Sequence, residues 1–83
     1  MKIFLTRTAQ KQKLRIPKSE LEKVEKQLIY LKKNPLSGKK LLGDYAGTRA
    51  IRVWPYRIVY YIKKLGNEIW VVSILHRQGA YKS

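Results

Sequence analysis

The second half of the chain alternates between apolar and polar positions in the manner of consecutive β-strands. In the stretch RAIRVW, which begins at Arg49, apolar residues that face one side alternate with residues that face the other. Residues 57–63 are rich in β-branched and aromatic side chains, and residues 64–67 (KLGN) predict a hairpin turn in which glycine can adopt a positive φ. Residues 68–75 are almost continuously apolar, which is typical of a central strand covered on both faces.

The first half predicts a short strand followed by a weak helix. Residues 2–7 (KIFLTR) contain a compact apolar cluster, which favours a strand. Thr6 or Thr8 is placed to cap the helix, whose few apolar residues lie among glutamine and lysine. Pro17 has no backbone N–H and is expected to end this helix.

A second, more regular helix is predicted from Ser19 to the Asn34-Pro35 step. Its first residues, Ser-Glu-Leu-Glu, fit a capping box, and leucine and valine recur at three- and four-residue spacing. Residues 35–48 contain one proline and three glycines, and we interpret them as a loop.

The order β-α-α-β-β-β predicts an α+β fold: a small, twisted, mainly antiparallel sheet with two N-terminal helices packed on one face. Residues 1–83 are expected to form a single domain, because no linker, repeat or low-complexity tract divides them. The pattern leaves open whether the first strand lies at the edge of the sheet or between later strands.

The charge of the chain narrows its possible partners. Nineteen lysines and arginines against five acidic residues give a net charge of +14. The expected partner is a polyanion: nucleic acid first, an acidic protein second and an anionic membrane third. A basic surface without a specific partner is the plain alternative. The N-terminal apolar run, Ile-Phe-Leu, is far too short for a signal peptide or a membrane span, so we expect a cytoplasmic protein with no membrane segment.

The residue types available for catalysis exclude several kinds of site. The chain has no cysteine and one histidine, too few ligands for a zinc or iron site, and no glycine-rich loop precedes a helix. Asp44 and Glu68 are the acidic residues of the C-terminal half, which leaves no carboxylate pair there. We therefore expect no metal and no cofactor, and an enzymatic activity would have to use cationic and phenolic groups.

Such groups suit the cleavage of RNA by attack of its own 2′-OH. That reaction needs a base for the hydroxyl, a cationic clamp on the phosphate and an acid for the departing 5′-oxygen. Arginine binds phosphate in bidentate fashion and keeps its charge at any relevant pH. The candidate catalytic residues are Arg57, His76, Arg77 and Tyr81.

Further side chains are expected to contact the RNA. They are Lys39, Lys40, Arg49, Arg52 and Tyr61. Solvated surface charge is the alternative for the two lysines and the two arginines. Trp54 and Trp70 fit a core or partner contact better than a base-stacking platform, although stacking stays open.

Four short segments carry a family resemblance. They are LLGDY at 41–45, RAIRV at 49–53, YRIVY at 56–60 and ILHR at 74–77, which Tyr81 follows. In this order they resemble the RelE/ParE superfamily of bacterial and archaeal type II toxins. The resemblance covers essentially the whole chain, because β-α-α-β-β-β is also the element order of that superfamily.

The resemblance implies a ribosome-dependent mRNA endonuclease that arrests translation and is held inactive by an acidic antitoxin encoded alongside it. It implies that Arg57 clamps the scissile phosphate and that Arg77 stabilises the transition-state charge or assists the leaving group. Tyr81 would orient or activate the reacting groups, or stack on a base, and His76 stands where some members have a basic residue. The expected partners are therefore the antitoxin, the ribosome and mRNA, with the toxin as a monomer or in a toxin–antitoxin hetero-oligomer.

The chain departs from the RelE pattern at Thr48 and Ala50, where such enzymes often carry lysines that act on the phosphate or as a base. The basic role then falls to Arg52, His76 or a loop lysine. The alternative function is that of a ParE-like toxin that inhibits DNA gyrase without cutting RNA, and a third is a catalytically weak, basic RNA-binding relative. The antitoxin is expected to lay an extended or helical segment across the sheet edge or the helix face.

Overall fold

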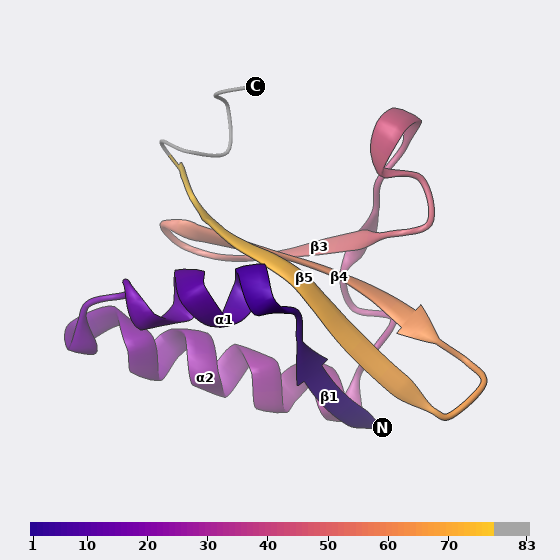
Figure 1. The fold of residues 1–83 in the computed structure, drawn as a ribbon, viewed down its shortest axis with the longest axis horizontal. Coiled ribbons are helices and arrows are strands. Elements are labelled where there is room, and N and C mark those ends of the chain that lie inside the picture. Colours follow the sequence, from indigo (N-terminus) through magenta and orange to yellow (C-terminus); the bar gives the residue numbers. More distant parts are fainter. Residues whose placement is uncertain (78–83) are drawn as a thin grey trace.

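The described part of the chain, residues 1–77, forms two helices and five strands in the computed structural model (Figure 1). In chain order the elements are β1 (Lys2–Leu5), α1 (Arg7–Leu14), α2 (Lys18–Lys33), β2 (Lys39–Lys40), a 3₁₀ turn (Gly43–Tyr45), β3 (Arg49–Val53), β4 (Tyr56–Lys63) and β5 (Glu68–His76). The predicted α+β fold is confirmed, with β2 as an additional strand.

The sheet has the strand order β1-β5-β4-β3-β2. β3, β4 and β5 form the antiparallel meander that the sequence predicts. β1 lies at one edge and pairs in parallel with β5, which makes the sheet mixed. At the other edge β2 pairs with β3 over two residues, so the prediction of a loop throughout residues 35–48 is wrong there. A strand of that length is too short to show an alternating pattern.

The two helices start in different ways. The Thr6 hydroxyl accepts a hydrogen bond from the Ala9 N–H at 3.2 Å and so caps α1, as predicted. α2 begins at Lys18, directly after Pro17, and no side chain caps it. The predicted capping box at Ser19 is therefore wrong: Pro17 has a φ of −59°, which suits a helix start, so Ser19 already lies inside the first turn.

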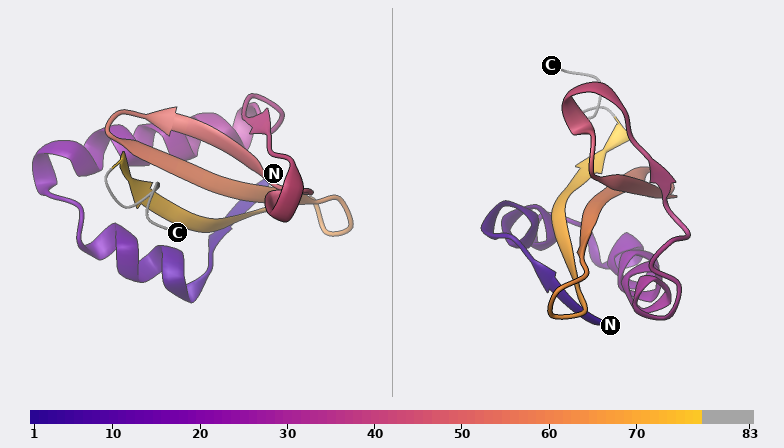
Figure 2. Two further views of the ribbon diagram at one scale, coloured as in Figure 1. Left: turned by 90° about the horizontal axis from the view of Figure 1, so that it is seen from above. Right: turned by 90° about the vertical axis from the view of Figure 1, so that its right-hand side faces the viewer.

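One face of the sheet is buried against the helices. Figure 1 shows both helices on the lower side of the sheet, and in the view from above they run along its two margins (Figure 2). Their apolar side chains join those of β4 and β5 in one cluster. The largest fully buried side chains are Val24, Leu31, Ile58, Tyr60, Ile69 and Val71. We call the opposite face of the sheet, which neither helix covers, the open face.

A β-bulge explains the continuous apolar run of β5. Val59 pairs with Ser73 whereas Tyr60 pairs with Val71, so Val72 is an extra residue on β5. The bulge shifts the alternation by one position, and apolar residues on both sides of it face the helices. On the open face the side chains of β5 are half-buried, which corrects the prediction of a strand covered on both faces.

Candidate nucleic-acid interface

Two arginines face each other across neighbouring strands on the open face. Arg52 of β3, which is exposed, pairs directly with Arg57 of β4, which is half-buried. Like charges directly opposite each other destabilise a sheet. Both salt bridges found within residues 1–77 involve helix residues alone, so no described carboxylate forms an ion pair with either arginine. Because guanidinium groups bind phosphate and carboxylate in bidentate fashion, this pair is suited to hold an anion.

Lys39 brings a third cation to the arginine pair. On β2 it pairs with Ala50 of β3, so the alternation places it on the same face as Arg52. Lys39, Arg52 and Arg57 line a hollow of about 550 Å³, which we call the cationic hollow. The other side chains that line it are Ser37, Leu41, Ala50 and Ile51. Its volume is within the range of small-ligand sites.

The loop before Lys39 is anchored to the sheet. The hydroxyl of buried Tyr60 donates to the Pro35 carbonyl at 2.7 Å and accepts from the Gly38 N–H at 2.9 Å. Burial raises the pKa of Tyr60, so its phenol stays protonated and able to donate. A Cβ on Gly38 would overlap the Tyr60 ring, and Arg49 Nη1 donates to the Gly38 carbonyl at 2.9 Å. This network fixes where Lys39 enters the sheet.

Three of the predicted RNA contacts lie away from the cationic hollow. Arg49 pairs with Lys40 on the side opposite to Arg57, and both line a separate hollow of about 480 Å³. Tyr61 lies on the open face, opposite Trp70, but four residues along β4 from Arg57, or roughly 13 Å. Contact of these three residues with RNA stays a prediction.

Arg77 follows the last residue of β5 and lies beside the turn between β3 and β4. Its backbone N–H donates to the Pro55 carbonyl at 2.7 Å, which ties the end of β5 to the turn between β3 and β4. Its Cζ lies 5.0 Å from the centre of the Trp54 ring, a cation–π contact. That Arg77 acts together with Arg57 stays a prediction.

His76 lies on the face opposite to Arg57. It pairs with Tyr56, and the two rings meet edge to face with their centroids 5.2 Å apart. Together with Gln12 of α1, and with Arg15 and Ile16 just after that helix, they line a hollow of about 310 Å³. Burial, followed by a hydrogen bond with Glu20, raises the pKa of Tyr56 to about 12, so this phenol is protonated at neutral pH. The structure thus separates His76 from the arginines, and Tyr81 lies outside the described residues.

The described residues bear on two further kinds of site, a metal site and a membrane-spanning helix. Within residues 1–77, no group of three histidine, aspartate or glutamate side chains is placed to hold a metal ion. Neither helix of this part is long and apolar enough to cross a membrane.

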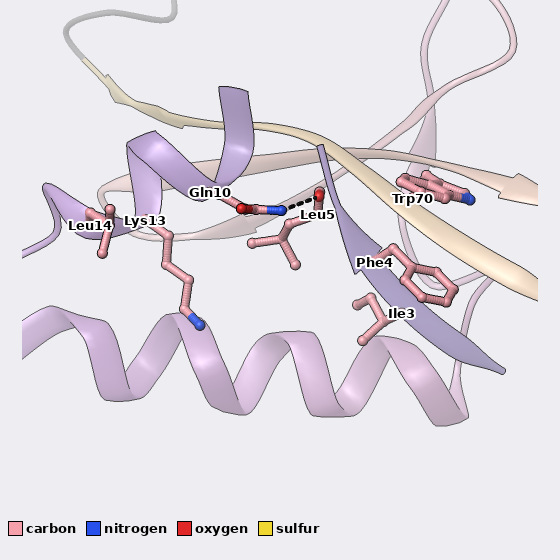
Figure 3. Close-up of a pocket in the computed structure, with 7 residues that line it drawn as sticks. All are labelled: Ile3, Phe4, Leu5, Gln10, Lys13, Leu14 and Trp70. Carbon is pink, nitrogen blue, oxygen red and sulfur yellow. Dashed lines mark hydrogen bonds between the residues drawn. The ribbon is translucent and has the colours of Figure 1, made fainter. Parts of the chain in front are cut away.

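An apolar groove lies where β1 meets α1. It encloses about 700 Å³ and is lined by Ile3, Phe4, Leu5, Gln10, Lys13, Leu14 and Trp70 (Figure 3). The rings of Phe4 and Trp70 stack with their centroids 5.0 Å apart, and Leu14 is 87% exposed. β1 is an edge strand, and no described strand pairs with its outer side. We call this surface the β1 groove.

A small α+β domain with both helices on one face of a mixed sheet is a fold that this chain shares with toxins of the RelE/ParE superfamily. The chain belongs to the family of ParE toxins of type II toxin–antitoxin systems (parDE), whose family model matches residues 3–81. This match confirms the resemblance seen in the sequence. A comparison with curated proteins finds no match.

Solved structures of toxins share the fold. The toxin–antitoxin complex RelBE2 from Mycobacterium tuberculosis matches with a TM-score of 0.85 and 28% identity, over 92% of this chain and 96% of that one. The YoeB/ParE toxin from Agrobacterium tumefaciens matches with a TM-score of 0.79 and 24% identity, over 92% and 98%. The intact E. coli RelBE complex matches with a TM-score of 0.76 and 19% identity, over 88% and 92%. The protein is thus similar to toxins that form complexes with antitoxins.

Proposed function

We propose that this toxin is a ribosome-dependent, metal-independent endoribonuclease that cleaves translated mRNA by attack of the 2′-OH and so inhibits translation. The observation that carries the proposal is the Arg52–Arg57 pair, which lies in the cationic hollow without a described carboxylate partner. A phosphodiester offsets the repulsion between the two guanidinium groups when it binds. The net charge of +14 favours association with the ribosome, which is itself a polyanion.

Within this reaction Arg57 clamps the scissile phosphate, and Arg52 and Arg77 add charge that stabilises the phosphorane. We assign the proton transfer from the 2′-OH to Lys39. Ala50, where RelE-type enzymes often carry a lysine, pairs directly with Lys39 on the neighbouring strand. The amine of Lys39 therefore reaches the hollow from β2 instead of β3.

The proposal is tested by brief expression of the toxin followed by primer extension on a defined mRNA. Cleavage at codon-linked positions is expected in the translated message. The same message without its start codon is the control and is expected to stay intact. Intact translated mRNA from cells that the toxin has arrested would contradict the proposal.

A second candidate function is inhibition of DNA gyrase without RNA cleavage. It is favoured by the family match, because the matching model describes ParE toxins. The same expression experiment separates the two functions. Arrest with intact mRNA and induction of the DNA-damage response would support the gyrase inhibitor.

The proposed role of Lys39 in proton transfer is tested with a matched pair of variants. Lys39→Met is expected to lower mRNA cleavage by about 100-fold, the lower end of the contribution of general acid–base groups. Lys40→Met is the control, because the adjacent lysine is directed to the other face of β2 and lines a different hollow. Equal effects of the two substitutions, measured as cleavage rates on programmed ribosomes, would argue against this assignment.

For the acidic antitoxin, we propose that an extended segment binds along β1 and places apolar side chains in the β1 groove. The unpaired outer side of β1 offers backbone hydrogen-bonding groups, and the exposed parts of Phe4 and Leu14 offer apolar contact. Lys13 lines the same groove and favours an acidic segment. The antitoxin segment would thus bind at the sheet edge and not along the helix face.

Leu14→Ser is expected to weaken antitoxin binding by about tenfold or more, since it removes an exposed apolar contact from the β1 groove. The control is Leu65→Ser, because Leu65 in the β4–β5 turn is 86% exposed against 87% for Leu14. Both variants should keep the wild-type melting temperature. Calorimetric titration with the antitoxin measures the difference, and unchanged affinity of Leu14→Ser would place the contact elsewhere.

A further inference from the structure

Trp54 projects from the turn between β3 and β4 and is 63% exposed. A buried aromatic side chain removes roughly 150–250 Å² from water, so this position forgoes much of that stabilisation. The turn itself is held on two sides. Lys23 Nζ of α2 donates to the Trp54 carbonyl at 3.0 Å, and the Arg77 N–H at the end of β5 donates to the Pro55 carbonyl at 2.7 Å. The indole is therefore presented to solvent from a fixed backbone.

The surroundings of the indole are cationic. The guanidinium of Arg77 stacks over it with Cζ 5.0 Å from the ring centre, which orients the ring and places positive charge beside it. Arg52 lies two residues before Trp54, whose turn directly follows β3, so their Cα atoms are at most roughly 7 Å apart, and Arg57 lies opposite Arg52. An aromatic ring beside three arginines is the combination with which proteins bind single-stranded nucleic acid, stacking bases on the ring and holding phosphates with the cations.

We propose that Trp54 is a stacking site for an unpaired nucleobase of the RNA strand whose phosphate lies in the cationic hollow. The separation along β3 lets one nucleotide reach the indole with its base while Arg52 and Arg57 hold a neighbouring phosphate. The choice of RNA as the ligand rests on the proposed function, but stacking and cleavage are measured independently. An exposed tryptophan also suits a protein contact, and the test includes that outcome.

The experiment uses the full chain with Trp70→Phe, which leaves Trp54 as its single tryptophan. Two probes are titrated: a short single-stranded 2′-O-methyl oligonucleotide, which cannot be cleaved through the 2′-OH, and an abasic oligonucleotide of equal length. The first is expected to quench the fluorescence of Trp54 and the second is not. In the background with native Trp70, Trp54→Leu should weaken binding of the first probe by about 5- to 150-fold, the range for loss of one stacked base, and leave the second unchanged.

Tyr45→Leu is the matched control, because Tyr45 in the 3₁₀ turn is also 63% exposed. It should bind both probes as the wild type does. Absence of quenching by the first probe, or an equal loss for both probes in Trp54→Leu, overturns the inference. So does a Trp54→Leu variant that keeps oligonucleotide binding and loses antitoxin binding, since the ring is then a protein contact.

If Trp54→Leu does not fold, the quenching measurement alone decides, because it leaves Trp54 in place. The proposed nuclease activity is tested by a separate measurement, the cleavage of translated mRNA. Quenching without cleavage of translated mRNA supports the stacking site and removes the nuclease. Cleavage without quenching supports the nuclease and overturns the stacking site.

Discussion

Arg57→Ala is expected to lower the rate of mRNA cleavage by about 10³-fold and to abolish growth arrest, because it removes the half-buried member of the arginine pair that holds the phosphate. The same substitution should leave the free energy of unfolding unchanged or slightly higher. It removes the repulsion between Arg57 and Arg52, which lie directly opposite each other. Cleavage on programmed ribosomes and thermal unfolding of the purified variant measure the two effects.

Lys63→Ala is the matched control for this prediction. Lys63 is a cation on the same strand and the same face as Arg57, but six residues further along, or roughly 20 Å. A loss of general attraction to the ribosome would appear in both variants, whereas loss of the phosphate clamp appears only in Arg57→Ala. Arg57→Lys keeps the charge without the bidentate geometry and should recover part of the activity. A folded Arg57→Ala variant with full toxicity would rule out this active site.

Much of the fold was predictable because its longer elements are encoded locally. The alternation in β3 and β4, the glycine turn after β4 and the Thr6 cap of α1 are all short-range signals. β2 carries no such signal. Its two residues are brought to the sheet edge by the hydrogen bond from Tyr60 to the Pro35 carbonyl, a contact between residues 25 positions apart. A strand that depends on a distant anchor cannot be deduced from the pattern of its own residues.

The strand β2 and the bulge in β5 decide which of the predicted site residues lie together. Because β2 is a strand, Lys39 and Lys40 are directed to opposite faces, and only Lys39 lines the cationic hollow with Arg57. The bulge at Val72 shifts the alternation of β5, so His76 faces the helices instead of the open face. A reading of residue types alone groups His76 with the arginines. A single extra residue in one strand separates them.

Tyr60→Phe is expected to lower the free energy of unfolding by about 2–4 kcal/mol, because it leaves the Gly38 N–H and the Pro35 carbonyl without their partner. Tyr60 is fully buried, so water does not readily replace the lost hydroxyl. In a domain of this size each kcal/mol lowers the melting temperature by about 4–8 °C. Thermal and urea unfolding both measure the change.

Tyr61→Phe is the control, because Tyr61 is the neighbouring residue on β4 and faces the other side of the sheet. Its hydroxyl makes no hydrogen bond found among the described residues, so its removal should change stability by no more than about 0.5 kcal/mol. If the anchor works as the structure indicates, Tyr60→Phe also loosens the loop before Lys39 and lowers cleavage at temperatures where the protein is still folded. Equal stability of the two variants would show that the loop holds Lys39 without Tyr60, and the remaining anchors would be the Arg49 bonds to Gly38 and Leu36 and the pairing of β2 with β3.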